Sequence, residues 1–171
     1  MEATAALQLK AEPLTREGFA PFGDVIESEG AKHFAINAGT IERFHDLAQV
    51  DLGEEEGGRT LVSIAECNVA AELPYRVTFV ERHPLGSQAF VPLDDTPLMV
   101  LVAPAGESVS PDALRAFVSN GRQGINYHRG IWHLPLISLC KGQRMLIVDR
   151  GGPGGNCEEY HFPEGEIFLT I

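Results

Sequence analysis

Short apolar runs with the alternation of β-strands recur along the whole chain. Residues 60–66, 77–83 and 88–92 are short apolar and β-branched runs of strand length, and residues 77–83 also place alternate side chains on opposite faces. Residues 98–103 are continuously apolar, which predicts a central strand buried on both faces. Glycine (18 residues) and proline (11 residues) separate these runs, so the pattern indicates many short strands joined by turns.

The same pattern extends to both ends of the chain. Residues 7–14, 22–26, 144–149 and 166–171 are further strand candidates, and residues 112–118 fit a helical turn that passes into a strand. Thr15 is a suitable N-cap for a short helix that includes Phe19. Roughly ten strands without a long amphipathic helix or a linker predict one all-β domain over residues 1–171. We expect a jelly-roll β-sandwich or barrel with a few short helices.

Composition narrows the class of protein. The chain has 171 residues, of which 44% are hydrophobic and 22% charged, values typical of a globular protein. Its formal net charge of −11 argues against nucleic acid or an anionic membrane as a partner. We expect a cytoplasmic protein, because the first residues lack a signal-peptide pattern and no apolar run reaches membrane-spanning length. Cys67, Cys140 and Cys157 are widely spaced, which favours free thiols in a reducing compartment.

The stretch from residue 123 to 135 concentrates chemically active side chains between glycines. His128 and His133 can transfer protons near neutral pH, and Arg129 can hold an anion. Tyr127 and Trp132 can exclude water from a pocket. On an unbroken strand His128 and His133 would face opposite sides, but a bend at the intervening glycine would let them converge.

A second cluster lies about forty residues earlier and is the other half of the predicted site. Glu81 and His83 are two residues apart on a predicted strand, so their side chains share one face, whereas Arg82 points to the other. Gln88 begins the returning strand. We therefore predict that this cluster and the 123–135 stretch meet inside one β cavity.

The spacing of these residues also allows a metal site. Glu81, two positions before His83, then Gln88 after four intervening residues, and later Gly-(three residues)-His128, resembles the two motifs of cupins. In that resemblance Glu81, His83, Gln88 and His128 would bind a divalent metal. An oxygen and imidazole set of this kind suits nickel, manganese or iron(II) better than structural zinc. A site without metal is the alternative.

Four blocks, running in order over nearly the whole chain, resemble the ureidoglycolate lyase family. They are residues 36–48, 81–90, 114–133 and 149–152, of which Glu-Arg-His-Pro-Leu-Gly and Asn-Tyr-His-Arg are the most specific. Members of that family often read Trp-His-His-Pro where this chain has Leu134 as the third residue. The departure makes His133 the histidine of that pair to carry function.

The resemblance implies a cupin-like barrel, a homodimer, and cleavage of ureidoglycolate to glyoxylate and urea during allantoin breakdown. A base must take the substrate's hydroxyl proton and an acid must protonate the leaving nitrogen. We expect His128 and His133 in these roles, with His83 or Glu81 as alternates. Further side chains would bind the carboxylate (Arg82 or Arg129), read the urea amide (Asn126, Gln88, Tyr127) and wall the pocket (Trp132).

Two other functions compete with this one. A different metal-dependent cupin enzyme, a dioxygenase or isomerase, would hold stoichiometric metal and lose its activity on chelation. A non-catalytic barrel would bind small acids or sugars and turn nothing over. The clustering of titratable side chains with an arginine favours the lyase, although release of ammonia in place of urea is an open alternative for the product.

Overall fold

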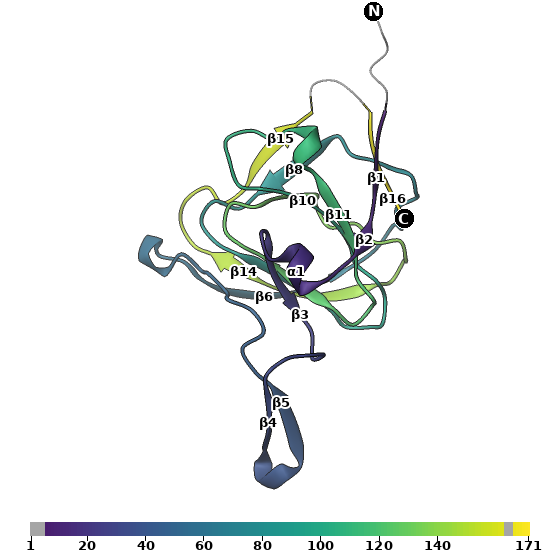
Figure 1. Cartoon of the computed structure of the whole chain (residues 1–171). Helices are drawn as coiled ribbons and strands as arrows, with labels where there is room; N and C mark the ends of the chain where they lie inside the picture. The colour runs from purple at the N-terminus through teal and green to yellow at the C-terminus, as the bar shows by residue number, and fades with distance from the viewer. Residues whose placement is uncertain (1–5, 163–165) are drawn as a thin grey trace, which may run out of the picture.

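The computed structural model describes residues 6–162 and 166–171 and is almost entirely β (Figure 1). The helical elements are short: α1 (Arg16–Phe19) and the 3₁₀ turns η1 (Asn37–Gly39), η2 (Glu54–Glu56) and η3 (Pro111–Ala113). In chain order the strands are β1 (Leu7–Lys10), β2 (Glu12–Pro13), β3 (Gly23–Ile26), β4 (His33–Ile36), β5 (Ile41–Phe44), β6 (Arg59–Glu66), β7 (Tyr75–Arg76), β8 (Phe79–Arg82), β9 (Gln88–Pro92), β10 (Met99–Ala103), β11 (Arg115–Val118), β12 (Gly124–Tyr127), β13 (Trp132–His133), β14 (Arg144–Gly151), β15 (Glu158–His161) and β16 (Ile167–Thr170).

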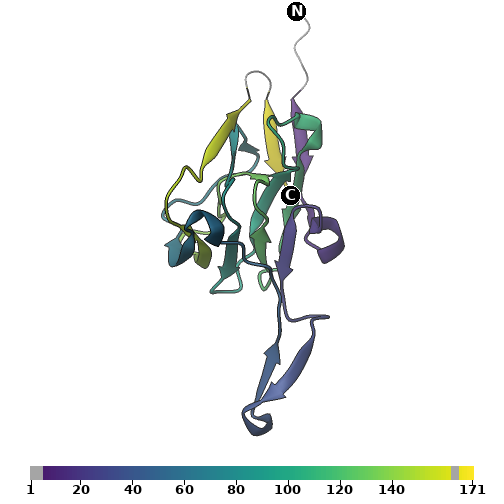
Figure 2. The same cartoon turned by 90° about the vertical axis from the view of Figure 1, so that its left-hand side faces the viewer.

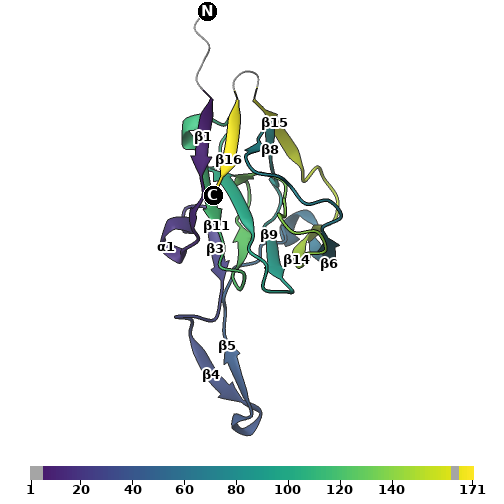
Figure 3. The same cartoon turned by 90° about the vertical axis from the view of Figure 1, so that its right-hand side faces the viewer.

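Two large sheets form the body of the molecule. One has the order β15-β8-β13-β10-β11-β2 and the other β3-β12-β9-β14-β6. Successive strands such as β8 and β9, or β12 and β13, lie in different sheets, so the chain passes repeatedly from one sheet to the other. This confirms the predicted all-β jelly-roll class. The strands form separate sheets rather than one closed barrel, and a smaller sheet, β1-β16-β7, lies beside them (Figures 1 and 3).

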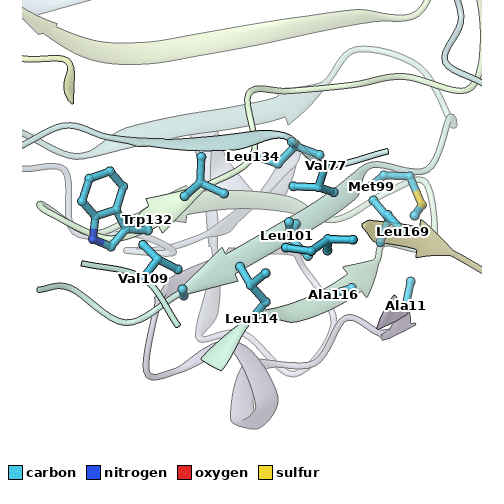
Figure 4. Packing of buried hydrophobic residues seen from close by; sticks show 13 residues of the cluster. Ala11, Val77, Met99, Leu101, Val109, Leu114, Ala116, Trp132, Leu134 and Leu169 are labelled. Atoms are coloured by element: carbon cyan, nitrogen blue, oxygen red, sulfur yellow. The ribbon is translucent and has the colours of Figure 1, made fainter. Parts of the chain in front are cut away.

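The hydrophobic core lies on both sides of β10. Leu101 belongs to one buried cluster, and its neighbours Val100 and Val102 belong to the other, which includes Phe90 and Met145 from the opposite large sheet. Figure 4 shows Leu101 within the first cluster, with Val77 and Leu134 close by. Every residue of β10 is buried, which confirms the prediction of a central strand without an exposed face.

Most predicted elements are present, although the strand expected over residues 7–14 divides into β1 and β2, which join different sheets. Thr15 caps α1 by accepting a hydrogen bond from the backbone N–H of Gly18 at 3.0 Å, as expected. Residues 111–118 form η3 followed by β11, which matches the predicted turn into a strand. The strand expected over residues 77–83 covers only 79–82, and Val77 packs in the same cluster as Val80. Strict alternation therefore fails at the start of this segment, where the backbone leaves the sheet.

A two-stranded hairpin projects from the body, which the sequence pattern did not predict. Strands β4 and β5 pair with each other through the register His33↔Phe44 to Ile36↔Ile41. In all three views this hairpin, here called the arm (residues 33–44), extends beyond the sheets (Figures 1, 2 and 3). Within the described residues, no helix has the length and hydrophobicity needed to span a bilayer.

Candidate active site

Glu81 and His133 are cross-strand neighbours on β8 and β13. Their side chains share one side of the sheet, and the Glu81 Oε1 to His133 Nε2 distance is 3.4 Å. His133 also lies opposite Val102, which packs in the cluster between the two large sheets. The pair therefore faces the space between the sheets, while the preceding Trp132 packs in the cluster on the other side.

His83 completes a group of three ligand-type side chains. It follows the end of β8, and its Nε2 lies 3.7 Å from Glu81 Oε1. The His83 and His133 ring centroids are 5.1 Å apart. Ligand atoms of Glu81, His83 and His133 all lie within 4.8 Å of one another, so these residues form a candidate metal-binding triad. The predicted meeting of the two sequence clusters therefore holds for these three residues.

Backbone carbonyl groups fix the orientation of both imidazoles. His83 Nδ1 donates to the carbonyl oxygen of Asn156 at 2.6 Å, and His133 Nδ1 donates to that of Ile131 at 3.1 Å. Since a carbonyl can only accept, each Nδ1 carries a hydrogen and each Nε2 faces the Glu81 carboxylate. The buried His133 Nε2 has no hydrogen-bond partner among the described residues. An imidazole whose Nδ1 bonds a backbone carbonyl, leaving Nε2 free, has the arrangement usual in metal-ligating histidines.

Gln88 and Asp149 extend the group from the facing sheet. Gln88 Nε2 donates to Asp149 Oδ2 at 3.1 Å, which leaves Gln88 Oε1 as the acceptor that lies 3.1 Å from His83 Nε2. Asn156 reinforces the same region, because its side-chain Oδ1 accepts from the N–H of Leu85 at 2.8 Å. The sequence pattern indicates chiefly a strand end at Asp149 and gives no signal for Asn156.

Burial and neighbouring charge set the protonation states at the site. Burial lowers the pKa of His133, so the imidazole is favoured in its neutral form. The neighbouring His133 holds the pKa of Glu81 below its usual value, despite partial burial, so this group is a carboxylate at neutral pH. Tyr127 stacks on His133 with ring centroids 4.1 Å apart, and burial raises the pKa of its phenol. Burial therefore disfavours the phenolate form of Tyr127, which it would need in order to act as a base.

His128 lies in a different environment. It follows β12, in the sheet opposite to that of His133, and its Nε2 contacts Asp24 Oδ2 at 2.9 Å. Asn126 Nδ2 donates to the same oxygen at 3.0 Å and to the Gln49 carbonyl at 2.9 Å. Although burial opposes it, the hydrogen bonds that Asp24 accepts from Asn126, the backbone N–H of Gln49 and His128 lower its pKa. The structure therefore does not bring His128 or Asn126 into the triad. His128 instead lines a surface hollow of about 710 Å³.

The two predicted anion-binding arginines already contact carboxylates. Arg129 forms a two-point pair with Asp51, with both N–O distances 2.9 Å. Arg82 Nε donates to Glu158 at 2.6 Å, and its guanidinium lies 4.8 Å from the Trp132 ring centroid. As predicted from alternation, Arg82 is on the face away from Glu81. To bind the carboxylate of a substrate, either arginine would first have to release the protein carboxylate that it contacts.

A jelly roll whose sheets enclose a carboxylate and two imidazoles defines a cupin-like enzyme. Comparison with known proteins then identifies its family: the model described as ureidoglycolate lyase matches residues 6–169. The chain belongs to the ureidoglycolate lyase family.

Relatives named ureidoglycolate lyase align over nearly their whole length. The one from Pseudomonas entomophila (strain L48) is 51% identical over 161 residues, covering 94% of this chain and 95% of the relative. The one from Burkholderia mallei (strain NCTC 10229) is 55% identical over 162 residues, covering 95% and 93%. Among solved structures, RmlC from Streptococcus suis in complex with dTDP-D-xylose aligns with a TM-score of 0.42 and 12% identity, covering 90% of this chain and 73% of that chain.

Proposed function

We propose that this chain, as a single cupin-like domain in a cytoplasmic homodimer, cleaves ureidoglycolate to glyoxylate and urea. Relatives that are 51–55% identical over almost the full chain bear the name of that activity. The observation that carries the proposal is the group of Glu81, His83 and His133, of which His133 is buried and the other two partly buried, because it supplies a neutral imidazole, a carboxylate and a second imidazole at one point. Positioned acid–base groups of this kind typically contribute about 10²–10⁴-fold to a rate.

The reaction needs one proton removed and one delivered. As the substrate's hydroxyl O–H bond breaks, its carbon–oxygen bond becomes the aldehyde of glyoxylate, the C–N bond breaks, and the departing nitrogen gains a proton to give urea. His133 Nε2 takes the hydroxyl proton, since burial keeps this imidazole neutral. Glu81, at 3.4 Å, stabilises the imidazolium that forms.

His83 is the acid in this scheme. Its Nδ1 faces the Asn156 carbonyl and its Nε2 faces Gln88 Oε1, so both ring nitrogens have acceptors. A protonated imidazole donates from both ring nitrogens, and in that form His83 can deliver a proton to the leaving nitrogen. Asp149 maintains this arrangement by fixing the Gln88 amide.

A divalent metal is a second way to use the same atoms. The unpartnered His133 Nε2 beside the Glu81 carboxylate fits a cation, and the nickel or manganese considered from sequence would be held by Glu81, His83 and His133, with Gln88 Oε1 adjacent. When bound, such an ion would polarise the substrate's oxygens. The His128–Asp24 pair would then be available as a proton acceptor outside the triad.

One assay tests the proposal directly. Purified protein is incubated with ureidoglycolate, with and without a chelator, and glyoxylate, urea and ammonia are measured separately. Equal release of glyoxylate and urea is expected. Release of ammonia in place of urea would show that the enzyme hydrolyses the ureido group and does not act as a lyase. Binding of the acid without any product would favour the non-catalytic barrel, and turnover of other substrates only would favour another cupin enzyme.

A further inference from the structure

Three consecutive residues leading into β15 contact the end of β8 and the residue after it. The first, Asn156, fixes the His83 ring through its backbone carbonyl. The third, Glu158, accepts a hydrogen bond from Arg82 at 2.6 Å. Between them lies Cys157, a free thiol that is exposed to solvent. Contacts on both sides of Cys157 therefore hold it beside the segment that carries two members of the triad.

The register of β15 on β8 directs the Cys157 side chain toward the triad. Glu158 lies opposite Arg82, and Glu159 lies opposite Glu81. Because successive side chains alternate between the two faces of a sheet, Cys157 shares the side of Glu159 and Glu81, and Glu158 shares the side of Arg82. The Cys157 Sγ lies 3.8 Å from Glu81 Oε2. A thiol is a weak donor, and its S–H group points to this carboxylate oxygen as its acceptor.

The two oxygens of the Glu81 carboxylate have different neighbours. Oε1 lies 3.4 Å from His133 Nε2 and 3.7 Å from His83 Nε2, whereas Oε2 accepts from the Cys157 thiol. The last torsion of a glutamate side chain has a broad distribution, so the rotamer alone does not set the plane of the carboxylate. The Glu81 side chain is also 21% exposed, which leaves it room to turn. The thiol on one oxygen and the imidazoles on the other define the plane together.

We propose that Cys157 is a positioning residue for the lyase reaction, whose thiol holds the Glu81 carboxylate in the plane that faces His133. This role rests on the proposed function, in which Glu81 stabilises the imidazolium formed on His133. The attraction between the two groups weakens as the charged atoms move apart, so a carboxylate that turns away raises the barrier of the chemical step. Glu81 acts on His133 and not on the substrate in that scheme, so substrate binding stays unchanged.

The contact itself is tested by infrared spectroscopy of the S–H stretching vibration, which needs no substrate. The Cys157 band is assigned from the difference between the wild type and Cys157→Ala. Cys140 is an exposed thiol that serves as the reference, because water is a weaker acceptor than a carboxylate. We expect the Cys157 band at a lower frequency than the Cys140 band, and Glu81→Ala should remove the difference. Equal frequencies in the wild type would overturn the proposal.

The consequence for the reaction is tested by the kinetics of glyoxylate release. Cys157→Ala should lower kcat about fivefold and leave KM unchanged, the effect of one lost hydrogen bond in the chemical step. The matched control, Cys140→Ala, replaces another exposed thiol and should keep the wild-type kcat. In a Glu81→Ala background, Cys157→Ala should cause no further decrease, because no carboxylate is left to position.

The double variant separates positioning from a general structural role. If Cys157 only supported the fold, Cys157→Ala would lower kcat by the same factor with and without Glu81, and circular dichroism melting would show a loss of stability. That result, or a wild-type kcat for Cys157→Ala, would overturn the positioning role while the lyase activity stands. A wild type that releases no glyoxylate would reject the proposed function, and the infrared bands would then decide the contact between thiol and carboxylate on their own.

Discussion

Glu81 Oε1 and His133 Nε2 lie 3.4 Å apart on directly opposed positions of neighbouring antiparallel strands. The imidazole is 1% exposed and hydrogen-bonds a backbone carbonyl through its other nitrogen. Two atoms that both prefer to accept a hydrogen bond therefore face each other, one on a buried and one on a partly buried side chain. A proton or a metal ion placed between them relieves this arrangement, and both uses lead to chemistry at the same point.

Replacing His133 should remove most of the activity. We expect His133→Ala to lower turnover about 10²–10⁴-fold, because it removes the atom that takes the hydroxyl proton. His128→Ala, also expected from the sequence to lose most turnover, tests the separate Asp24 environment, and His161→Ala at an exposed position is the control. Steady-state glyoxylate release measures all three. A near-native rate for His133→Ala would exclude it as the base.

Exchanging the acid and the amide of the Gln88–Asp149 pair tests whether Asp149 positions His83. Asp149→Asn should let the Gln88 amide reverse and present its NH₂ group to His83, which lowers kcat by about tenfold, the equivalent of one lost hydrogen bond. Adding Gln88→Glu supplies a carboxylate that accepts from both His83 and the amide introduced at position 149, so kcat should recover. If kcat of the double variant is no higher than that of Asp149→Asn, Asp149 does not position His83 and its role is structural.

Metal binding should depend on the triad and not on His128. Chelator-treated protein is titrated with nickel or manganese, and the melting temperature is recorded. An ion at 100 times its Kd stabilises the folded state by about 2.7 kcal/mol, which raises the melting temperature measurably. His128→Ala should respond like the wild type, whereas His83→Ala should not respond. If neither nickel nor manganese changes the melting temperature of the wild type, the site works by acid–base chemistry without a metal.

Asp24 should contribute a pH-dependent part of the folding stability. Its pKa is lowered in the folded protein from the ordinary value of 3.8, so the unfolded chain binds the proton more readily. The contribution is therefore present above about pH 4 and is lost as pH falls through the lowered pKa. Urea unfolding of Asp24→Asn between pH 7 and pH 3 should show a shallower acid decline than the wild type. The exposed Asp112→Asn serves as the control, and equal slopes for all three proteins would contradict the prediction.

The fold class and the shared face of Glu81 and His83 could be predicted from the sequence because they follow local rules, whereas the pairing of Glu81 with His133 joins distant segments. Alternation placed Glu81 and His83 on one face, and the continuous apolar run of 98–103 predicted the central strand, which is observed over 99–103. The same alternation could have identified Asp149, which continues the inward-facing series Met145 and Ile147 along β14. Its pairing with Gln88 spans 61 residues, and such a distant contact leaves no local pattern.

The placement of His128 could not be predicted from local rules. A turn with Gly130 at φ 77° separates β12 from β13, as the sequence suggested, but the two strands enter different sheets. His128 and His133 consequently face different surroundings although only five positions separate them. The arm was not predicted because its strands are short and almost wholly exposed, so residues 33–44 lack the burial that imposes a regular alternation of apolar and polar side chains.

The backbone carbonyl of Asn156 hydrogen-bonds His83, and the Asn156 side chain hydrogen-bonds the N–H of Leu85. The His83 side of the site can therefore form only after Asn156 has been synthesised. During synthesis, Glu81 and His83 leave the ribosome well before the group that fixes the His83 ring, which lies 73 positions further along the chain. A nascent chain therefore cannot orient this imidazole until nearly all of the protein has been made. Fragments that end before residue 156 should be inactive even where their strands have paired.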